Sequence, residues 1–384
     1  MTIDTLLSEA VKSGSIAGAT AFVGNQAGVI STHAAGFRDA ASGAAMTPDT
    51  VFQIASMTKA ITSVAAMQLV ERGLLSLDAP LSGLLPELAN PQVIDGFGDD
   101  GTVILRPAAC DITLRHLLTH TSGFGYEFMS ADMLRARGPA GGPPPGTKAA
   151  LISPLLFDPG ERWEYGISTD WVGLAVEAAS GLRLDAYFQA EVFKPLGMVD
   201  TGFFVTDAMT SRRAALQLRG EDRALSPFPV EIGGGPKAEV LSAGGGLYST
   251  GPDYMRFLRM VLNGGSLDGV TILKAATVAD MSRNQIGDIR AGAMATINPM
   301  FALANDPFPD QHSGWGLGFL INPERSPNGR AAGSLSWAGI ANTYYWIDPE
   351  SDVAALIMMQ HLPFGDPAAL ALYGAFERAV YDLK

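Results

Sequence analysis

Strand-forming segments occur at both ends of this chain and are separated by a long, mostly helical middle. Residues 19–37 contain two β-rich runs joined by the turn formers Gly24 and Asn25. The other β-rich runs lie near the carboxyl end, at residues 314–322, 333–349 and 353–360. Because strands must pair to satisfy their backbone groups, this order predicts one antiparallel sheet assembled from both ends of the chain.

Helical segments flank these strands. An amphipathic run from Ile3 to Val11, ended by Gly14, predicts an N-terminal helix. Asp366 and Pro367 are typical of the start of a closing helix. We therefore predict an α+β fold, with an antiparallel sheet flanked by N- and C-terminal helices and an inserted, mostly helical domain.

The predicted domain boundaries follow from this order. Residues 1–76 and 232–384 form a discontinuous sheet domain, and residues 77–231 form the mostly helical domain. The length of 384 residues favours two domains or one domain with insertions. A Pro- and Gly-rich stretch near residues 126–151 is typical either of a lid over a site or of a disordered insertion.

The charge of the chain limits the partners that it can bind. Its formal net charge is −13 and its pI is about 4.8. Nucleic acids and anionic membranes attract basic surfaces, so we expect neither as a partner. The content of 47% hydrophobic and 17% charged residues is typical of a globular protein. We expect a neutral small molecule as the partner, and the sequence does not indicate an oligomeric state.

Features of export, membrane insertion and metal binding are not found in the sequence. The amino terminus lacks a basic segment followed by an apolar one, and the apolar run near the carboxyl end is shorter than the ~20 residues that span a bilayer. These patterns predict a cytoplasmic protein. Cys110 is the only cysteine, and the five histidines lack metal-ligand spacing. We expect no disulfide within the chain, no metal and no cofactor.

Ser56 and Lys59 form a polar pair in the otherwise apolar segment of residues 51–73. They lie three positions apart, so on a helix their side chains share one face. The apolar residues on both sides predict a buried helix, in which a polar pair needs a reason, although the spacing alone also fits an ordinary surface pair. The chain has no G-x-S-x-G motif, so the nucleophile turn of α/β-hydrolases is excluded.

A buried Lys59 suits the role of a base for Ser56. Desolvation and the positive end of the helix dipole both disfavour the ammonium form, so we expect a lysine neutral enough to take the proton of the serine. The same position leaves the backbone N–H of Ser56 free to stabilise an oxyanion. The pair therefore suggests acyl-enzyme chemistry.

Several motifs, in order along most of the chain, resemble one known superfamily. They read SMTK, LRHLLTHTSGFGY, FDPGERWEYGISTDWVGLAVEAASG, VFKPLGMVDTGFF, SAGGGLYSTGPDYMRFLRMVLNGG, GWGLGF and SWAGIANTYYWIDP. They are similar to the serine β-lactamases and penicillin-binding proteins, and most similar to family VIII carboxylesterases, which share the fold of class C β-lactamases but act mainly on esters. The resemblance implies a β-lactamase/transpeptidase-like fold.

The resemblance assigns the second catalytic motif to Tyr165, in a loop ahead of a helix that one of residues 168–170 would cap. Its phenol would share the proton taken from Ser56 and deliver it to the leaving alkoxide. The bare sequence also allows an aromatic side chain packed under a loop. Class C β-lactamases carry an asparagine two positions after this tyrosine, where this chain has Ile167. An apolar residue there disfavours lactams and peptides and favours plain esters.

The resemblance places the third motif, Lys-Thr-Gly in β-lactamases, at Trp337, Ala338 and Gly339. An indole in place of the cation would form an apolar wall of the substrate pocket. Gly339 would let the strand approach the substrate, and the N–H of Ile340 would be the second oxyanion donor. Without the resemblance, Trp337 would be interpreted as an aromatic residue of the core and Gly339 as the glycine of a β-bulge.

Other motifs suggest structural roles. His116 and His120 lie at helical spacing among leucines, which favours buried structural histidines. The stretch SAGGGLYST lacks the lysine of a phosphate-binding loop, so we interpret it as a turn that lines the cleft. Cys110 has no histidine partner in view and is expected to be inert.

These observations predict a serine hydrolase that cleaves short- to medium-chain carboxylic esters through an acyl-enzyme on Ser56. Transfer of the same acyl group to an alcohol or amine stays open. Hydrolysis of β-lactams or D-amino-acid peptides is a further alternative, which Ile167 and Trp337 disfavour. A receptor that binds without turnover is disfavoured because Ser56, Lys59 and Tyr165 are all present.

Overall fold

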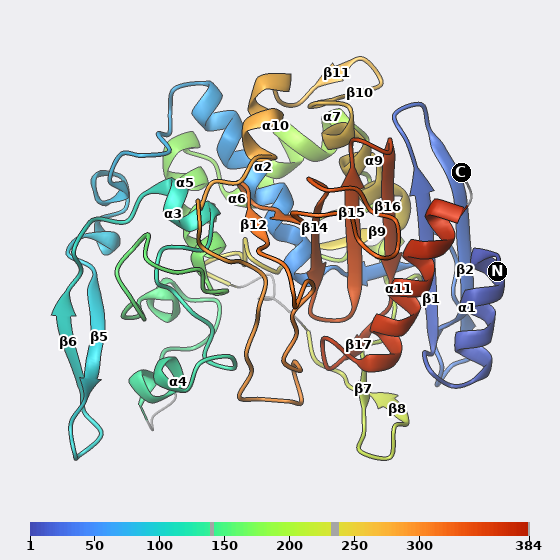
Figure 1. The fold of residues 1–384 in the computed structure, drawn as a ribbon, viewed down its shortest axis with the longest axis horizontal. Helices are drawn as coiled ribbons and strands as arrows, with labels where there is room; N and C mark the ends of the chain where they lie inside the picture. The colour runs from blue at the N-terminus through green and yellow to red at the C-terminus, as the bar shows by residue number, and fades with distance from the viewer. Residues whose placement is uncertain (139–141, 232–237, 383–384) are drawn as a thin grey trace.

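An eight-stranded antiparallel sheet lies at the centre of the structure, a computed structural model that describes residues 1–138, 142–231 and 238–382 (Figure 1). The sheet has the strand order β12-β13-β14-β15-β16-β1-β2-β3. The N-terminal strands are β1 (Gly18–Gly24), β2 (Val29–Asp39) and β3 (Ala44–Ala45). The C-terminal strands are β12 (Gly314–Trp315), β13 (Leu320–Ile321), β14 (Leu335–Gly339), β15 (Thr343–Asp348) and β16 (Val353–Met358). Because β1 pairs with β16, the predicted sheet built from both ends of the chain is confirmed.

Helices cover both faces of this sheet. The termini lie on the same side of the molecule, where α1 (Ile3–Lys12) packs against α11 (Pro367–Asp382), and α9 (Gly251–Leu262) contacts β1, β15 and β16 (Figure 1). Side chains alternate along β15, so Tyr344 stacks on Tyr373 of α11 while Tyr345 contacts Tyr254 of α9. As predicted, Asp366 caps α11, accepting hydrogen bonds from the next residues' backbone. Burial on both faces explains why β1, β15 and β16 are buried throughout.

In the middle of the chain, helices predominate over strands, although most of the described residues there lie in loops and turns. Its helices are α3 (Leu114–Leu118), α4 (Ala131–Arg137), α5 (Ser168–Ser180), α6 (Leu184–Phe188), α7 (Lys194–Leu196) and α8 (Asp207–Thr210), with a π-helical turn at Gln189–Phe193 and 3-10 turns at Leu81–Gly83, Pro86–Leu88 and Lys148–Leu151. Its strands, which the sequence did not predict, are β5 (Gln92–Phe97), β6 (Val103–Pro107), β7 (Gln217–Arg219) and β8 (Leu225–Pro227).

The proposed domain boundaries stay predictions. β7 of the middle segment pairs with β17 (His361–Leu362), so the two predicted domains share a small sheet. The boundary at residue 232 borders residues 232–237, which lie outside the described residues. The predicted lid-like stretch near 126–151 includes residues 139–141, which also lie outside them.

The helix α2 (Thr58–Glu71) runs through the interior between the sheet and the helical segment (Figure 1). Its residues from Thr58 to Leu69 are all buried, as the apolar pattern on every side of the helix predicted. It packs against α5, and the 3-10 turn η1 (Ala55–Met57) ahead of it contacts β14. The short elements around it are β4 (Val51–Gln53), β9 (Tyr248–Thr250), β10 (Ser266–Leu267), β11 (Val270–Thr271) and α10 (Ala275–Met281).

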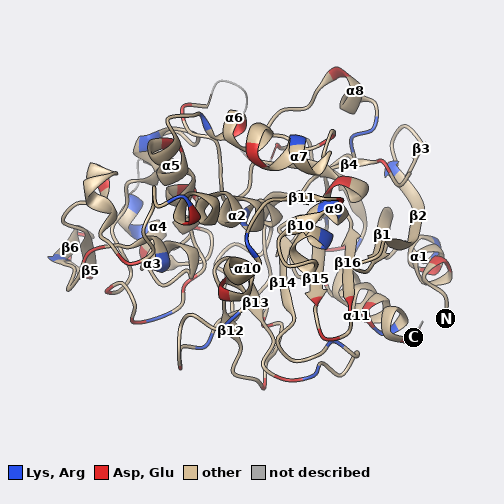
Figure 2. Ribbon diagram, turned by 90° about the horizontal axis from the view of Figure 1, so that it is seen from above, with Lys and Arg blue, Asp and Glu red and all other residues tan. Residues whose placement is uncertain are grey.

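Charged side chains are mostly excluded from the centre of the fold. Figure 2 shows acidic and basic segments interspersed over the outer helices and loops, whereas β14 and β16 contain no charged residue. A buried exception is the ion pair of Arg330 and Glu377, whose side chains lie 2.9 Å apart. Within the described residues, no helix combines the length and the apolar character that crossing a bilayer requires.

Candidate active site

Ser56 lies in the short 3-10 turn η1, which directly precedes the helix α2 in whose first turn the sequence had placed it. Lys59 is the second residue of α2, and its Nζ lies 3.3 Å from the Oγ of Ser56. The preceding residue, Ala55, has a φ of 45°, a left-handed conformation that is strained for a residue with a side chain. The serine therefore stands on a fixed, strained turn at the start of a buried helix.

The loop of residues 242–247 is held against α2 by hydrogen bonds from buried threonines. Thr62 donates to the carbonyl of Ala243 at 2.7 Å, and Thr58 accepts from the N–H of Leu247 at 3.2 Å. Ser242, Gly244 and Gly245 of this loop border the cavity that contains Ser56. The structure thus places the SAGGG stretch where the sequence analysis expected a turn lining the cleft.

Lys59 is only 2% exposed and donates three hydrogen bonds. Its acceptors are the carbonyl of Gly244 at 2.7 Å, the phenol of Tyr126 at 3.1 Å and the hydroxyl of Ser56 at 3.3 Å. An ammonium group has three N–H donors, so each hydrogen has one acceptor. This geometry fits a buried lysine that is charged at rest.

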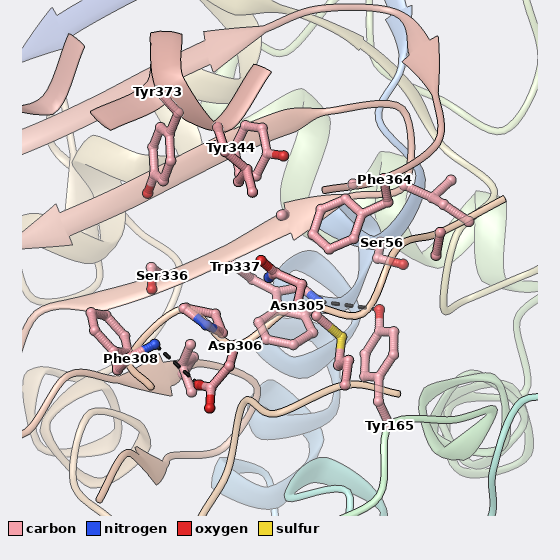
Figure 3. Close-up of a pocket in the computed structure, with 18 of the residues that line it drawn as sticks. Ser56, Tyr165, Asn305, Asp306, Phe308, Ser336, Trp337, Tyr344, Phe364 and Tyr373 are labelled. Carbon is pink, nitrogen blue, oxygen red and sulfur yellow. Dashed lines mark hydrogen bonds between the residues drawn. The ribbon is translucent and has the colours of Figure 1, made fainter. Parts of the chain in front are cut away.

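Tyr165 lies beside the same lysine. The Nζ of Lys59 is 4.7 Å from the centre of its ring, and the indole N–H of Trp337 donates to its phenol oxygen at 3.2 Å (Figure 3). Because that oxygen accepts from Trp337, its own hydrogen is free to be donated to a substrate. Trp337 therefore holds the phenol in place, in addition to the wall role that the sequence suggested.

Tyr126 is a functional candidate that the sequence analysis did not single out. Its phenol contacts Lys59 directly, although the two residues are 67 positions apart in the chain. The sequence analysis treated it as the start of the lid-like stretch and as the last letter of a motif. No spacing rule connects it to Lys59, because only the tertiary fold brings the loop after α3 onto the start of α2.

The protonation of Lys59 differs from the expectation. Burial lowers its pKa, as foreseen, but the phenols of Tyr126 and Tyr165 and the carboxyl group of Asp170 raise it, and the net pKa lies above the ordinary value. The neighbouring groups thus outweigh desolvation. Little of the lysine is in the amine form near neutral pH, and the fraction that can accept a proton increases as the pH rises.

Asp170, in the first turn of α5, places a buried carboxyl group near Lys59. Burial raises the pKa of this carboxyl group, while Lys59 and the hydrogen bonds from Gly244 and Ser242 favour its ionised form. Its Oδ1 accepts from the N–H of Gly244 and from the hydroxyl of Ser242, each at 3.0 Å. A side chain on Gly244 would place its Cβ 2.9 Å from this carboxyl group and 3.2 Å from the Nζ of Lys59. A glycine is therefore required where the loop passes between the two charges.

The predicted cap of α5 is wrong. The residue that precedes the helix is Ile167, which makes no side-chain capping bond. Ser168 is already helical, and its hydroxyl bonds that of Ser122 at 2.8 Å. Asp170 is bound to the 242–247 loop instead, so tertiary contacts replace the local capping that its position suggested.

The edge of β14 borders the nucleophile. A Cβ on Gly339 would lie 2.4 Å from the carbonyl oxygen of Ile54, so only glycine allows this strand to approach the turn of Ser56. Within the described residues, β13 pairs only with Leu335 and Ser336, and no strand covers the rest of β14 on that side.

Two residues that border this site have backbone N–H groups without an acceptor in the described part of the chain. Among the described residues, the N–H groups of Ser56 and Ile340 have no acceptor, and both residues border the same cavity. Unpaired N–H groups beside a nucleophile are the requirement for an oxyanion hole. The arrangement can therefore stabilise a tetrahedral intermediate on Ser56.

The cavity has a volume of about 640 Å³, and Figure 3 shows part of its lining. It brings together most of the predicted site residues, namely Ser56, Tyr165, Trp337, Gly339 and Ile340, and it is also bordered by Tyr126. Ile167 does not line it, but is half-buried against the core. The sequence analysis missed the segment from Met294 to Gln311, which contributes several lining residues.

The two histidines of the LRHLLTH motif have structural surroundings. The Nδ1 of His116 accepts from the backbone N–H of Thr113, which completes a capping box at the start of α3. His120 is buried against Trp315 and Tyr165, and burial lowers its pKa well below the ordinary value. No cluster in the described part of the chain has three or more histidine, cysteine or acidic side chains arranged to hold a metal.

Several known proteins are similar to this chain over nearly its whole length. The Beta-lactamase family profile matches residues 3–379. A lovastatin esterase of Penicillium rubens is 33% identical over 396 residues, covering 99% of this chain and 98% of the relative. Esterase EstB of Burkholderia gladioli is 28% identical over 409 residues, covering 99% and 94%. A solved structure of a simvastatin synthase (LovD) mutant from Aspergillus terreus has a TM-score of 0.84 and 31% identity, covering 99% and 94%.

The sheet, its flanking helices and the serine–lysine pair at the start of a buried helix define a class of serine hydrolases and acyltransferases. The Beta-lactamase family profile, which matches nearly the whole chain, identifies the family within this class. The chain belongs to the beta-lactamase family and has its β-lactamase/transpeptidase-like fold, which confirms the resemblance read from the sequence motifs.

We expect the substitution Gly339→Ala to lower kcat for nitrophenyl butyrate by roughly a hundredfold, with a smaller effect on KM. The added Cβ would push β14 away from Ile54 and displace the N–H of Ile340, and the loss of one oxyanion donor costs about this much. Steady-state kinetics test the effect. Gly83→Ala is the matched control, because a Cβ there meets nothing within 4 Å. Equal kcat values for both variants would contradict the role of Gly339.

We expect Asp170→Asn to move the acid side of the kcat/KM profile to lower pH. Asparagine keeps an oxygen for Gly244 and Ser242 but removes a charge that raises the pKa of Lys59. A lower pKa leaves more of the lysine as amine at a given pH. The other titratable groups around Lys59, namely Tyr126, Tyr165 and His120, are unchanged.

The control for this experiment is Ser242→Ala, which removes a hydrogen bond to the same carboxyl group but no charge. The acid side of its kcat/KM profile should lie at the same pH as in the wild type. If Asp170→Asn also leaves the profile in place, the carboxyl group does not set the proton affinity of Lys59.

Proposed function

We propose that this protein is a carboxylesterase that cleaves neutral carboxylic esters through an acyl-enzyme on Ser56. The observation that carries the proposal is the hydroxyl of Ser56, 3.3 Å from the Nζ of Lys59. Both Ser56 and Ile340, whose backbone N–H groups are unpaired among the described residues, line the same cavity. A nucleophile, its base and an oxyanion hole are the parts that acyl transfer requires. The esterases among its relatives support this choice.

In the proposed first half-reaction, the amine form of Lys59 takes the proton of Ser56 as the serine oxygen bonds to the ester carbonyl carbon. The N–H groups of Ser56 and Ile340 stabilise the oxyanion. When the intermediate collapses, the bond to the alcohol oxygen breaks and Tyr165 gives that alkoxide its proton. The ammonium of Lys59 then returns a proton to the phenolate, which leaves an acyl-enzyme and a neutral alcohol.

The second half-reaction repeats these steps with water. Lys59 takes a proton from water as its oxygen bonds to the acyl carbon, and the bond to Ser56 breaks with return of a proton to the serine. Tyr126, hydrogen-bonded to the same lysine, keeps the Nζ oriented throughout. A base whose pKa is raised gives a rate that increases towards alkaline pH.

The proposed substrates are neutral esters of short to medium acyl chains. Trp337 lines the cavity where the β-lactamase motif carries a cation, and its N–H is engaged with Tyr165. A carboxylate on the substrate would therefore lack the partner that lactams find in β-lactamases. Acyl transfer to an alcohol is the second candidate function, because the structure of the LovD synthase is similar to this chain over nearly its whole length.

We expect Ser56→Ala to abolish both ester hydrolysis and labelling by a fluorophosphonate, which reacts with activated serines. Lys59→Ala should reduce kcat by roughly a hundredfold or more, because the base is lost, and Tyr165→Phe should also be severe. Mass spectrometry of the labelled protein identifies the modified residue. A near-normal kcat in either the Ser56 or the Lys59 variant would refute the assignment of these two residues as nucleophile and base. Absence of labelling in the wild type would favour a receptor that binds its ligand without turnover.

A preference for esters over lactams is the second expectation from the proposed function. Nitrocefin should be turned over with a kcat/KM roughly a hundredfold or more below that for nitrophenyl butyrate, because the cavity wall at Trp337 offers a lactam carboxylate no cation. Parallel assays on one preparation of the enzyme measure the ratio. Comparable values for the two substrates would contradict the specificity argument.

A further inference from the structure

Ile340 lies in a three-residue loop that joins β14 to β15. Gly339 pairs with Thr343 across this loop, and the N–H of Asn342 donates to the carbonyl of Gly339 at 3.0 Å. Asn342 has a φ of 61°, in the left-handed region. A tight turn followed by one left-handed residue is a common connection between antiparallel strands, and glycine adopts the left-handed conformation most readily. The turn alone would therefore accept glycine at position 342.

The side chain of Asn342 is completely buried and uses every hydrogen-bonding group of its amide. Its Nδ2 donates to the carbonyls of His361 and Pro363, each at 2.8 Å. Its Oδ1 accepts from the phenol of Tyr344 at 2.7 Å and from the N–H of Gly365 at 3.2 Å. An amide has two N–H donors and two acceptor sites, so all of them are satisfied. The side chain, and not the turn conformation, is what distinguishes asparagine from glycine here.

These bonds join the turn to residues 361–365, which contribute to the cavity wall. Phe364 of this segment borders the cavity that contains the nucleophile (Figure 3). The backbone of Phe364 is fixed in turn, because it donates to the carbonyl of Phe301 and accepts from the N–H of Leu303, each at 2.9 Å. The amide of Asn342 therefore anchors the turn to a part of the wall that is itself held in place.

The backbone of the turn gives Ile340 less support than this side chain does. The carbonyl of Ala341 accepts from the N–H of His361 at 3.2 Å, and that of Asn342 accepts from the N–H of Met359 at 3.3 Å, both of which are long hydrogen bonds. The N–H of Ile340 itself has no acceptor among the described residues. An unpaired donor has no bond of its own to orient it, so its position depends on how firmly the rest of the turn is held.

We propose that Asn342 is a positioning residue for the oxyanion hole, because its buried amide holds the turn so that the N–H of Ile340 stays where the oxyanion forms. This inference rests on the proposed esterase function. Donors stabilise an oxyanion best when they are already in place before the reaction, since no stabilisation is then lost to their reorganisation. A buried and fully satisfied network of four hydrogen bonds provides this rigidity.

The substitution Asn342→Gly separates the two roles of this residue. Glycine keeps the left-handed conformation, whereas all four side-chain bonds are lost. We expect kcat/KM for nitrophenyl butyrate to fall roughly tenfold or more, mainly through kcat, because outright loss of an oxyanion donor costs about a hundredfold to a thousandfold and a misplaced donor loses part of that. If the asparagine served only the turn, the rate would stay at the wild-type value.

Inhibition by trifluoromethyl propyl ketone provides a readout that a merely structural role would not move. Ser56 adds to the carbonyl carbon of this ketone, Lys59 takes the hydroxyl proton, and the carbonyl oxygen becomes an anion that mimics the ester oxyanion. We expect Asn342→Gly to raise the inhibition constant by about the same factor as it lowers kcat/KM. A smaller fraction of folded enzyme would lower the rate but leave the inhibition constant unchanged.

Tyr344→Phe is a milder variant of the same network. It removes the hydroxyl that donates to the Oδ1 of Asn342, while the ring can keep its stacking on Tyr373. One of four bonds is lost, so we expect a smaller decrease in kcat/KM and a matching rise in the inhibition constant of the ketone. This variant tests the inference even if Asn342→Gly does not fold.

The matched control is Gln68→Ala, which removes another buried amide that joins separate segments. The Nε2 of Gln68 donates to the carbonyls of Glu191 at 3.0 Å and Ile272 at 3.2 Å. Its Oε1 accepts from the phenol of Tyr187 at 3.3 Å. Gln68 is not among the described residues that border the cavity. This variant should lose thermal stability but keep the wild-type inhibition constant and the wild-type kcat/KM per active site, counted by titration with a fluorophosphonate.

The outcomes separate this inference from the proposed function. If the wild type hydrolyses esters through Ser56 but Asn342→Gly and Tyr344→Phe keep its kcat/KM per active site, Asn342 does not position the donor. If kcat/KM falls while the inhibition constant of the ketone stays unchanged, the loss lies outside the oxyanion hole and the inference is equally refuted. If the wild type cleaves no ester and is not inhibited by the ketone, the proposed function itself fails.

Discussion

The burial of the Lys59 ammonium group is the constraint on which the rest of the site depends. A charged amine away from water is tolerated only when its hydrogens have acceptors and its charge has a counterpart. The acceptors come from η1, from the loop after α3 and from the 242–247 loop, and the counterpart comes from α5. Each of these segments is therefore fixed relative to the start of α2, and the same contacts that satisfy the lysine also place Ser56, Tyr126 and Tyr165.

The same constraint explains which parts of the site could be predicted from the sequence. The proximity of Ser56 and Lys59 could be predicted, because the two residues are only one helical turn apart in the sequence. The apolar residues around them predicted that the pair is buried. Tyr165, Trp337 and Gly339 were reached only through the resemblance to a family, since no spacing links them to the serine. Tyr126 and Asp170 were missed as partners of Lys59, because their proximity is purely tertiary. The direction of the pKa of Lys59 was misjudged for that reason, as burial was visible in the sequence and the neighbouring phenols were not.

The fold was more predictable than the site. The aromatic run of β15 and the apolar run of β16 indicated strands, and the order of the segments predicted a sheet built from both ends of the chain, which the structure confirms. The hairpin of β5 and β6 escaped prediction, because several of its residues are exposed and carry no strong apolar alternation. The predicted cap of α5 failed because the carboxyl group of Asp170 is bound to a distant loop.

The pairing of β1 with β16 has a consequence for the synthesis of this protein. β1 leaves the ribosome well before β16, the strand that pairs with one of its two edges, because the whole helical middle of the chain is translated between them. A nascent chain therefore carries an unpaired, aggregation-prone strand edge until β16 has been made. The oxyanion donor of Ile340 also arrives late, so no partial chain contains a complete site. Protection of β1, by a chaperone or by transient local contacts, is thus part of what this topology demands from the cell.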